Sequence, residues 1–247
     1  MQILEKHFQT FISQVLPTAC IVCDLFQKLS ICEKCLGLLK VDGLLNYECC
    51  LQCGICLEAS ELHEQRCKQC LNNPPYFDQT FCLDRYDGIL QEALHQLKYQ
   101  KRLAFAHGLA DAWNQTTANH YFDQHALYLL PVPLREEKLT LRGFNQSWEI
   151  ARRLCCSKPI KKSPYILRRH HYSEHQAGGS FASRQHSVQG MFYIDPFHLE
   201  SLDGKVVIVF DDVMTTGATL NEIARVLKDN GVSRVINWVL LRTSRLT

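Results

Sequence analysis

The sequence lacks any long apolar run. Its longest uncharged apolar stretch, residues 126–134, contains two prolines, whereas a helix that crosses a bilayer needs about twenty apolar residues. The first residues interrupt their apolar content with Glu5, Lys6 and His7, which is not typical of a signal peptide. Net charge is low as well, at +2, and together with 46% hydrophobic residues this excludes a disordered chain. We therefore expect a folded cytoplasmic protein without a membrane span.

The cysteines are distributed unevenly. Eleven of the thirteen lie at or before Cys82. An odd count with close C-x-x-C spacing argues against a secreted disulfide framework and for a small metal-stapled module. The charge divides similarly: residues 1–75 carry six Lys/Arg and eight Asp/Glu, and residues 76–247 carry twenty-one and seventeen. Because Pro74 and Pro75 form a stiff junction, we predict two domains, 1–75 and 76–247.

Four C-x-x-C pairs predict metal binding. They are Cys20/Cys23, Cys32/Cys35, Cys50/Cys53 and Cys67/Cys70. Two such pairs complete a tetrahedral Cys₄ site, so eight ligands suit two structural zinc ions, and both consecutive and interleaved pairing remain open. Cys49, Cys53 and Cys56 allow a different register for the third pair. Reduced, metal-free cysteine is the simplest alternative, and an iron–sulfur cluster is the main rival because it also uses thiolates.

Apolar patterns alternate between strands and helices in the second domain. Short apolar runs predict buried strands at residues 127–132, 206–210 and 235–241. Helical stripes occupy residues 89–99, 146–155 and 220–227, and a further amphipathic helix is predicted over residues 1–19. Strand, helix and strand in succession form a βαβ unit. The predicted fold class is therefore α/β with a mostly parallel sheet.

The most informative motif begins where the second of these strands ends. Asp211 and Asp212 follow the strand, and a loop of small residues then leads into a helix: Thr215, Thr216, Gly217, Ala218 and Thr219. Unpaired N–H groups and the dipole at a helix start favour an anion, and the threonine hydroxyls add donors for a phosphate. We expect the two acids to be exposed and to accept hydrogen bonds from the hydroxyls of a ribose. An ordinary capped turn is the simpler alternative.

This motif resembles the phosphoribosyl-pyrophosphate (PRPP) signature of type I phosphoribosyltransferases. Residues 130–146, with LPVPLR and LRGFNQ, resemble the matching segment of the ComF/GntX family, and HQLKY at residues 95–99 resembles another motif of that family. The resemblance implies a zinc module joined to a phosphoribosyltransferase-like domain with helices on both faces of its sheet. It also implies that Asp211 and Asp212 hold the ribose hydroxyls and that residues 215–219 wrap the 5′-phosphate.

Basic residues lie around the LRGFNQ motif. Residues 135–170 carry ten Lys/Arg against three Asp/Glu, and Arg135, Lys138 and Arg142 are the candidates for binding a diphosphate with Mg²⁺. A solvated basic face is the simpler alternative. Candidates for contact with nucleic acid are Arg142, Phe144, Trp148, Arg168 and Arg169, with Tyr165 and Tyr172 available for stacking.

Two functions of different classes follow from the family resemblance. The first is an accessory protein of natural transformation that handles incoming single-stranded DNA, with components of the DNA-uptake machinery as partners. The second is an active phosphoribosyltransferase that uses PRPP and an acceptor which the sequence does not identify. A DNA-binding role predicts affinity that falls steeply with salt, whereas turnover predicts Mg²⁺-dependent release of pyrophosphate.

Overall fold

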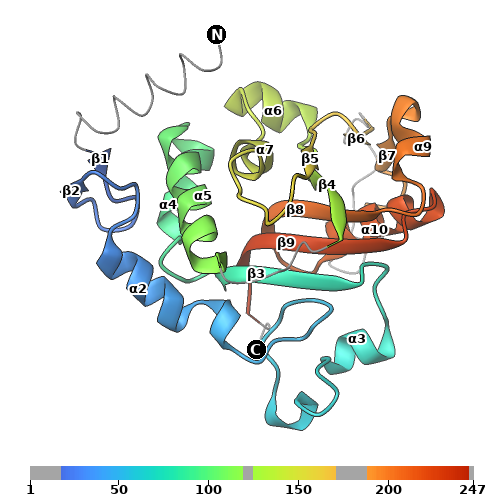
Figure 1. Ribbon diagram of the computed structural model, residues 1–247, viewed down its shortest axis with the longest axis horizontal. Coiled ribbons are helices and arrows are strands. Elements are labelled where there is room, and N and C mark those ends of the chain that lie inside the picture. Colours follow the sequence, from blue (N-terminus) through green and yellow to red (C-terminus); the bar gives the residue numbers. More distant parts are fainter. Residues whose placement is uncertain (1–17, 119–124, 171–187, 245–247) are drawn as a thin grey trace.

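The computed structural model describes residues 18–118, 125–170 and 188–244. A five-stranded parallel sheet forms the centre, with helices on both faces, and the cysteine-rich segment packs beside it (Figure 1). This confirms the predicted fold class. Most of the helix predicted over residues 1–19 lies outside the described ranges, as does Tyr172. Thr18–Ala19 form strand β1 instead of a helix end, because they pair with β2 (Phe26–Gln27).

The central sheet has the strand order β3-β9-β8-β4-β5, and every neighbouring pair is parallel. The strands are β3 (Gln79–Arg85), β4 (Ala126–Pro131), β5 (Lys161–Lys162), β8 (Val206–Met214) and β9 (Arg234–Arg242). β8 continues past Phe210, where we predicted its end, because β9 supplies ladder partners as far as Met214. Asp211 and Asp212 are therefore strand residues.

One face of the sheet carries the larger aliphatic and aromatic side chains. Leu129, Ile208, Phe210 and Trp238 pack there against α4 (Gln91–Tyr99), α5 (Ala104–Thr117) and α7 (Gln146–Ala151). Trp113 of α5 lies edge-on to Phe210, with ring centroids 6.1 Å apart. α7 ends earlier than predicted because Asn114 of α5 bonds the backbone of Arg153 and Cys155 just beyond it, at 3.1 and 2.6 Å.

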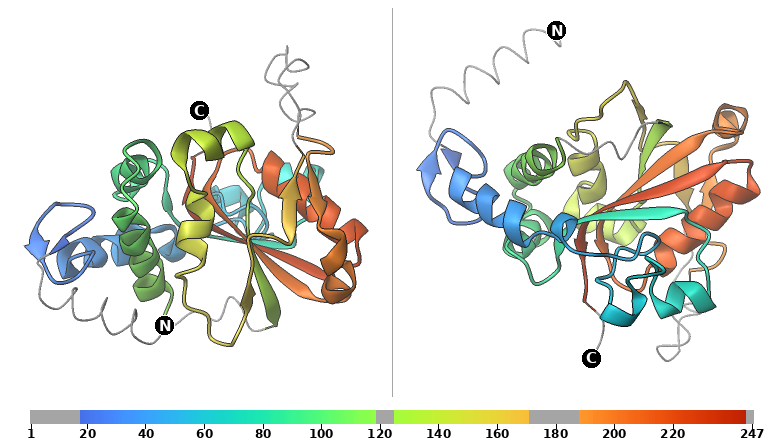
Figure 2. Two further views of the ribbon diagram at one scale, coloured as in Figure 1. Left: turned by 90° about the horizontal axis from the view of Figure 1, so that it is seen from above. Right: turned by 60° about the horizontal axis from the view of Figure 1, so that its bottom comes forward.

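The opposite face packs against α10 and a short ribbon. Val207, Val209 and Val239 contact the apolar stripe of α10 (Ala218–Asp229) in a second core. The ribbon is the antiparallel pair β6 (Leu167–Arg169) and β7 (Phe192–Ile194), followed by η4 (Pro196–His198) and α9 (Leu199–Leu202). Figure 2 shows α4 and α5 on one side of the sheet and α10 on the other.

The N-terminal segment runs along the domain as a chain of short elements. These are β1, β2, α2 (Glu33–Asp42), η1 (Leu44–Asn46), η2 (Ala59–Glu61) and α3 (Lys68–Asn72). A further helix, α6 (Glu136–Arg142), follows β4. Within the described ranges, none of the helices combines the length and the apolar character that crossing a membrane requires.

Candidate functional site

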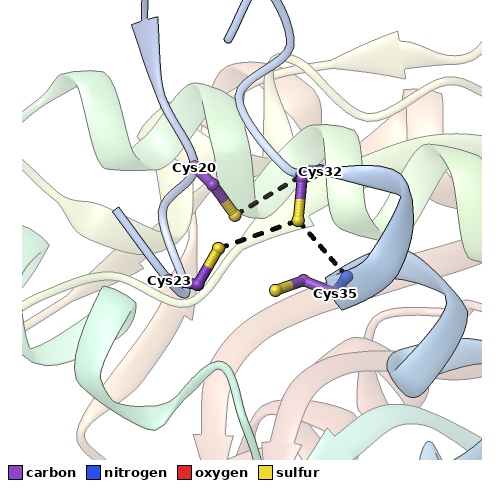
Figure 3. Close-up of side chains that lie close together, drawn as sticks. All are labelled: Cys20, Cys23, Cys32 and Cys35. Carbon is purple, nitrogen blue, oxygen red and sulfur yellow. Dashed lines mark hydrogen bonds between the residues drawn. The ribbon is translucent and has the colours of Figure 1, made fainter. Parts of the chain in front are cut away.

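The eight predicted metal ligands form two groups of four, each built from consecutive C-x-x-C pairs. Cys20, Cys23, Cys32 and Cys35 make the first group, and Cys50, Cys53, Cys67 and Cys70 make the second. Within each group all four sulfurs lie within 4.8 Å of one another. Figure 3 shows the four side chains of the first group converging on one point. Consecutive pairing is therefore the arrangement that this geometry favours over interleaved pairing.

The two groups are local copies of one design. In each, a tight turn closes after the first cysteine: the N–H of Asp24 donates to the Cys20 carbonyl at 2.9 Å, and that of Gly54 to the Cys50 carbonyl at 2.8 Å. Both turn residues have positive φ, 58° and 68°. The third cysteine then precedes a helix and the fourth lies in its first turn, in α2 and in α3. Two sulfurs thus come from a turn and two from a helix start.

The sulfur spacing suits a single tetrahedral ion. With metal–sulfur bonds of about 2.3 Å, a tetrahedron places its sulfurs about 3.8 Å apart. The Sγ atoms of Cys23 and Cys32 are 3.7 Å apart, as are those of Cys53 and Cys67. A cluster of several irons between the same sulfurs would hold them further apart. Burial opposes ionisation of Cys20, but N–H donors from Cys32 and neighbouring residues outweigh it and lower the pKa of that thiol to about 7.

Cys49 and Cys56 lie outside the second group. They face each other across an isolated antiparallel bridge, with Sγ atoms 3.9 Å apart. The third C-x-x-C pair is therefore Cys50/Cys53. The alternative pair Cys53/Cys56 does not form the group, because Cys50 and not Cys56 lies within 4.8 Å of Cys67 and Cys70.

Each cysteine group is packed into one of the two cores that flank the central sheet. The first meets α5 at Gly108, where an added Cβ would lie 2.5 Å from Ile21. The second joins β3, because the Thr80 N–H donates to the Leu51 carbonyl at 3.0 Å and Gly54 lies against the Cys82 sulfur. Since both contacts are buried, the cysteine groups and the sheet stabilise each other.

The acid pair differs from the exposed pair that we expected. Asp212 is only 4% exposed, and its carboxylate forms an ion pair with Lys98 of α4 and accepts a hydrogen bond from Gln146 of α7 at 3.4 Å. Asp211 is half-buried and accepts from the Ser147 hydroxyl at 3.4 Å. The expectation of exposure fails because β8 extends through both residues and carries them under α4 and α7.

The two carboxyls have opposite pKa shifts. Burial raises the pKa of Asp211 well above its ordinary value, and the charge on Asp212 adds to that rise. Burial opposes ionisation of Asp212 too, but the Lys98 ammonium outweighs it and lowers the pKa of that carboxyl. The shifts therefore favour a single negative charge on the pair, carried by Asp212, and favour the protonated form of Asp211, which could donate as well as accept a hydrogen bond.

The RGFNQ motif positions Gln146 and Ser147, the residues that donate hydrogen bonds to the two acids. Gly143 ends α6 at φ 84°, and Asn145 caps α7 by accepting from the N–H of Ser147 at 2.9 Å. The Asn145 amide also donates to the Val132 carbonyl at 2.9 Å, which ties the start of α7 to the end of β4. The next two residues, Gln146 and Ser147, are thereby directed at the acids. The motif acts as a turn that presents side chains to β8.

The loop after β8, residues 215–219, is the predicted phosphate-binding turn, and we call it the phosphate loop. Thr215 and Thr216 are exposed, and the Thr216 hydroxyl accepts from the Ala218 N–H at 3.3 Å. Gly217 precedes α10 at φ 81°, and an added Cβ would lie 2.6 Å from the Met214 side chain. The positive φ therefore favours glycine here. The turn opens at the carboxyl edge of the sheet, where ligands bind in open α/β folds.

Arg242 fixes the base of this loop to the second cysteine group. It is 6% exposed, and its guanidinium donates to the Met214 and Thr215 carbonyls at 3.2 and 2.5 Å. Its Nε donates in the other direction, to the Cys53 carbonyl, at 3.0 Å. One buried side chain therefore connects the C-x-x-C turn of the cysteine-rich segment with the start of the phosphate loop.

Several predicted basic residues gather beside the acids. Burial lowers the pKa of Lys138, and the charges of Arg142, Arg135 and Lys98 lower it further. Burial followed by the charge of Arg135 likewise lowers the pKa of Arg169 to about 10. These charges therefore act on one another. Arg168 instead pairs with Asp195 at 3.7 Å.

Two of the predicted aromatic contacts for nucleic acid are half-buried. Phe144 is half-buried and packs against the core that includes Trp113 and Ile150, and Trp148 is half-buried in α7. Tyr165 is 63% exposed and lies under the Arg168 guanidinium at 5.7 Å. Of these three aromatic residues, Tyr165 alone offers a largely open ring.

Comparisons with known proteins agree with this geometry. Residues 150–246 match the phosphoribosyl transferase domain. The chain is 28% identical over 227 residues to the DNA utilization protein YhgH of Escherichia coli (strain K12), covering 86% of this chain and 90% of that protein. It is 28% identical over 194 residues to competence protein F of Haemophilus influenzae, covering 77% and 84%. It is 24% identical over 241 residues to competence protein ComFC of Bacillus subtilis, covering 91% and 95%. These matches support a relationship to the ComF family.

Among solved structures, the chain is similar to a hypoxanthine phosphoribosyltransferase from Staphylococcus aureus. The identity is 15% and the TM-score 0.30, over 56% of this chain and 62% of the other. A TM-score this low adds nothing to the assignment of the fold, which the sheet order and the domain match already provide.

The structure adds site residues that the sequence analysis did not select. Lys98, Gln146 and Ser147 contact the acids, and Arg242 contacts the phosphate loop. Lys98 and Gln146 stood within motifs that resembled the family, so their motif positions were the available signal. Arg242 lies at the end of an apolar strand, and nothing in the local sequence distinguishes it from a surface arginine.

Proposed function

We propose that this protein handles single-stranded DNA in the cytoplasm during natural transformation, binding a ribose 5-phosphate unit at the acid pair and phosphate loop. The observation that carries the proposal is the position of two cations at Asp212: Lys98 is paired with it, and Arg142 donates to Gln146, which donates to Asp212. The charges of Arg135 and Lys138 act in the same group. Such a cluster suits several phosphates in a row better than one. The names of the relatives, competence protein and DNA utilization protein, support the same role.

The test is the dependence of single-strand affinity on salt. Arg135→Ala removes one cation of the cluster, and its loss should lower the log–log salt slope by roughly 0.7 while weakening binding similarly for all sequences. Arg234→Ala is the matched control, because Arg234 is exposed at the amino end of β9, on the opposite edge of the sheet. Fluorescence anisotropy of a labelled oligonucleotide at several salt concentrations measures both slopes. Flat salt dependence in the wild type contradicts the proposal.

The second candidate function is phosphoribosyl transfer from PRPP to an acceptor that the residues do not identify. The turn at Gly217 and the half-buried Asp211 favour it, since a 5′-phosphate and ribose hydroxyls need just such partners. Arg135, Lys138 and Arg142 would then hold the diphosphate together with Mg²⁺, whose charge stabilises the departing pyrophosphate. Mg²⁺-dependent release of pyrophosphate from PRPP distinguishes this function from binding alone.

We further propose that both cysteine groups hold structural zinc. Four thiolates leave no open coordination position, and the sulfur spacing matches one ion in each group. The ions would stabilise the turns and helix starts of the cysteine-rich segment without taking part in chemistry, because metal binding supplies folding free energy in such modules.

Elemental analysis should accordingly give two zinc ions for each chain. Cys23→Ser, in the more exposed first group, should reduce the content to one, since the second group is separately complete. Cys155→Ser is the control, because Cys155 is an exposed cysteine outside both groups. Iron in place of zinc, or no change in metal content for Cys23→Ser, contradicts the assignment.

A further inference from the structure

Two cysteines of the N-terminal segment belong to neither group of four. Cys49 and Cys56 are both half-buried, and they lie in one hairpin, residues 48–57, which also carries Cys50 and Cys53 of the second group. We call this segment the cysteine hairpin. The sulfurs of Cys49 and Cys56 are 3.9 Å apart, so the two thiols contact each other. Neither thiol is used by the metal groups or by the acid pair.

The backbone holds Cys49 and Cys56 in a register that suits a disulfide. Hydrogen bonds lie on either side of the pair: the Cys50 N–H donates to the Ile55 carbonyl at 2.8 Å, and the N–H of residue 57 donates to the carbonyl of residue 48 at 2.9 Å. The pair between them is therefore a non-hydrogen-bonded pair of an antiparallel bridge. Such a pair has its Cα atoms about 4.5 Å apart, within the range of about 4.4–6.8 Å that a disulfide spans. The two sulfurs can therefore bond with little movement of the backbone.

A cavity of about 280 Å³ lies on one side of the cysteine hairpin and exposes one of the two sulfurs to a small molecule. Cys56 lines this cavity together with the apolar side chains of Leu44 and Leu57. Cys49 is not part of the lining, and its thiol lies against the Leu44 carbonyl at 3.7 Å. A reagent in the cavity therefore reaches Cys56 first, and Cys49 is placed to react second.

The charges around this cavity favour a reagent that carries carboxylates. Arg85 and Arg242 line it with one acid, Glu58, whose carboxylate is 3.8 Å from the Lys68 ammonium. Arg242 is buried and donates to backbone carbonyls, whereas Arg85 is half-buried and its guanidinium lies over the Tyr47 ring at 5.3 Å. Arg85 is thus the cation that can meet a carboxylate of an incoming molecule. Low-molecular-weight disulfides with carboxylates, such as oxidised glutathione, are the class of reagent that these walls suit.

We propose that Cys49 and Cys56 form a reversible dithiol–disulfide site whose substrate is a low-molecular-weight disulfide that carries carboxylates. The Cys56 sulfur attacks one sulfur of the reagent: a bond forms between them, the S–S bond of the reagent breaks, and the departing thiolate takes up the proton that Cys56 gives up. The Cys49 sulfur then attacks the Cys56 sulfur, which forms the bond between the two cysteines. The second half of the reagent leaves as a thiol with the Cys49 proton. The protein is oxidised by two electrons, and the reagent is reduced to two thiols.

The new bond closes the cysteine hairpin around the turn that carries Cys50 and Cys53. A disulfide restricts the unfolded conformations of the loop that it closes, so the oxidised hairpin should be more stable than the reduced one. This inference does not depend on the proposed function, because the acid pair and the phosphate loop take no part in it.

Intact-mass spectrometry of the full chain treated with oxidised glutathione tests the proposal. Cys155→Ser with Cys156→Ser is the background, because Cys155 is exposed and this adjacent pair lies outside the cysteine-rich segment, where it would react separately. We expect a loss of two hydrogens for each chain, no retained glutathionyl group and an unchanged metal content. Dithiothreitol should restore both thiols.

Single variants in this background separate the two roles. Cys49→Ser should stop at the mixed disulfide and keep one glutathionyl group, because the second thiol is missing. Cys56→Ser should neither lose the two hydrogens nor keep that group. Cys82→Ser is the matched control: Cys82 is 4% exposed and lies against Gly54 of the same hairpin, and its loss should leave the reaction unchanged. The proposal is overturned if the background chain does not lose two hydrogens, if Cys56→Ser still loses them, or if oxidation releases metal.

Discussion

Replacing Lys98 with methionine should lower the free energy of unfolding by about 3 kcal/mol at neutral pH, as expected when one partner of a buried ion pair is removed. The side chains of Lys98 and Asp212 are 17% and 6% exposed, so water screens their interaction weakly. Methionine keeps the length of the lysine stem and removes only the ammonium. What remains is a buried carboxylate without its cation. Urea denaturation measures the loss.

The loss should increase as the pH rises. In the wild type the lowered pKa of Asp212 adds stability above its unfolded pKa, and that stability disappears only in acid. In Lys98→Met the carboxyl stays buried without a counter-charge, so its pKa rises, and stability then falls as the pH increases through that raised pKa. Measurements at about pH 4.5 and about pH 7.5 should show a wider gap at the higher value.

A double variant provides the control for this prediction. Lys98→Met with Asp212→Asn replaces both charges by neutral side chains of similar size, and it should recover most of the stability at neutral pH. Recovery would assign the loss to the unpaired charge. A double variant as unstable as the single variant, or a gap that does not depend on pH, would show that Lys98 acts mainly through packing of its stem.

Much of the fold could be predicted from the sequence because its signals are local. The apolar run at residues 206–210 and the stripe of Leu220, Ile223 and Leu227 each report burial directly, and a βαβ unit has few alternative arrangements. The length of β8 could not be read in the same way. Asp211 and Asp212 are poor strand formers, and only the ladder partners in β9 and the cation from α4 allow them to continue the strand.

The cysteine groups show the same limit. Spacing identified the ligands, but consecutive pairing depends on contacts that C-x-x-C spacing does not encode. The register of the third pair depends on the bridge between Cys49 and Cys56. The shared turn-and-helix structure of the two groups also could not be predicted from the sequence. It consists of backbone hydrogen bonds around Cys20 and Cys50, and the residues between the cysteines differ in the two groups.

Replacing Arg242 with methionine should lower the free energy of unfolding by about 3 kcal/mol, since the carbonyls of Cys53, Met214 and Thr215 lose a charged donor and each unmade bond costs about 1 kcal/mol or more. Lysine should not rescue the variant fully, because one ammonium cannot reproduce the fork of a guanidinium that donates in two directions. Arg234→Met, at the exposed end of the same strand, should change stability by less than about 0.5 kcal/mol.

Arg242→Met should also weaken ligand binding at the phosphate loop. This effect distinguishes a role of Arg242 in positioning the loop from a role in global stability alone. Arg242 connects the Cys53 turn with Thr215, so its loss should release the loop while β8 and α10 stay folded. Hydrogen exchange at residues 215–218 should rise in Arg242→Met and also in Cys50→Ser, which disrupts the second cysteine group from the other end. The affinity for ribose 5-phosphate should fall in the same variants. It should fall about tenfold for each 1.4 kcal/mol that binding must spend on ordering the loop. Unchanged exchange at the loop in both variants would restrict Arg242 to holding the cysteine-rich segment against the sheet, because a group that positions the loop cannot be removed without moving it.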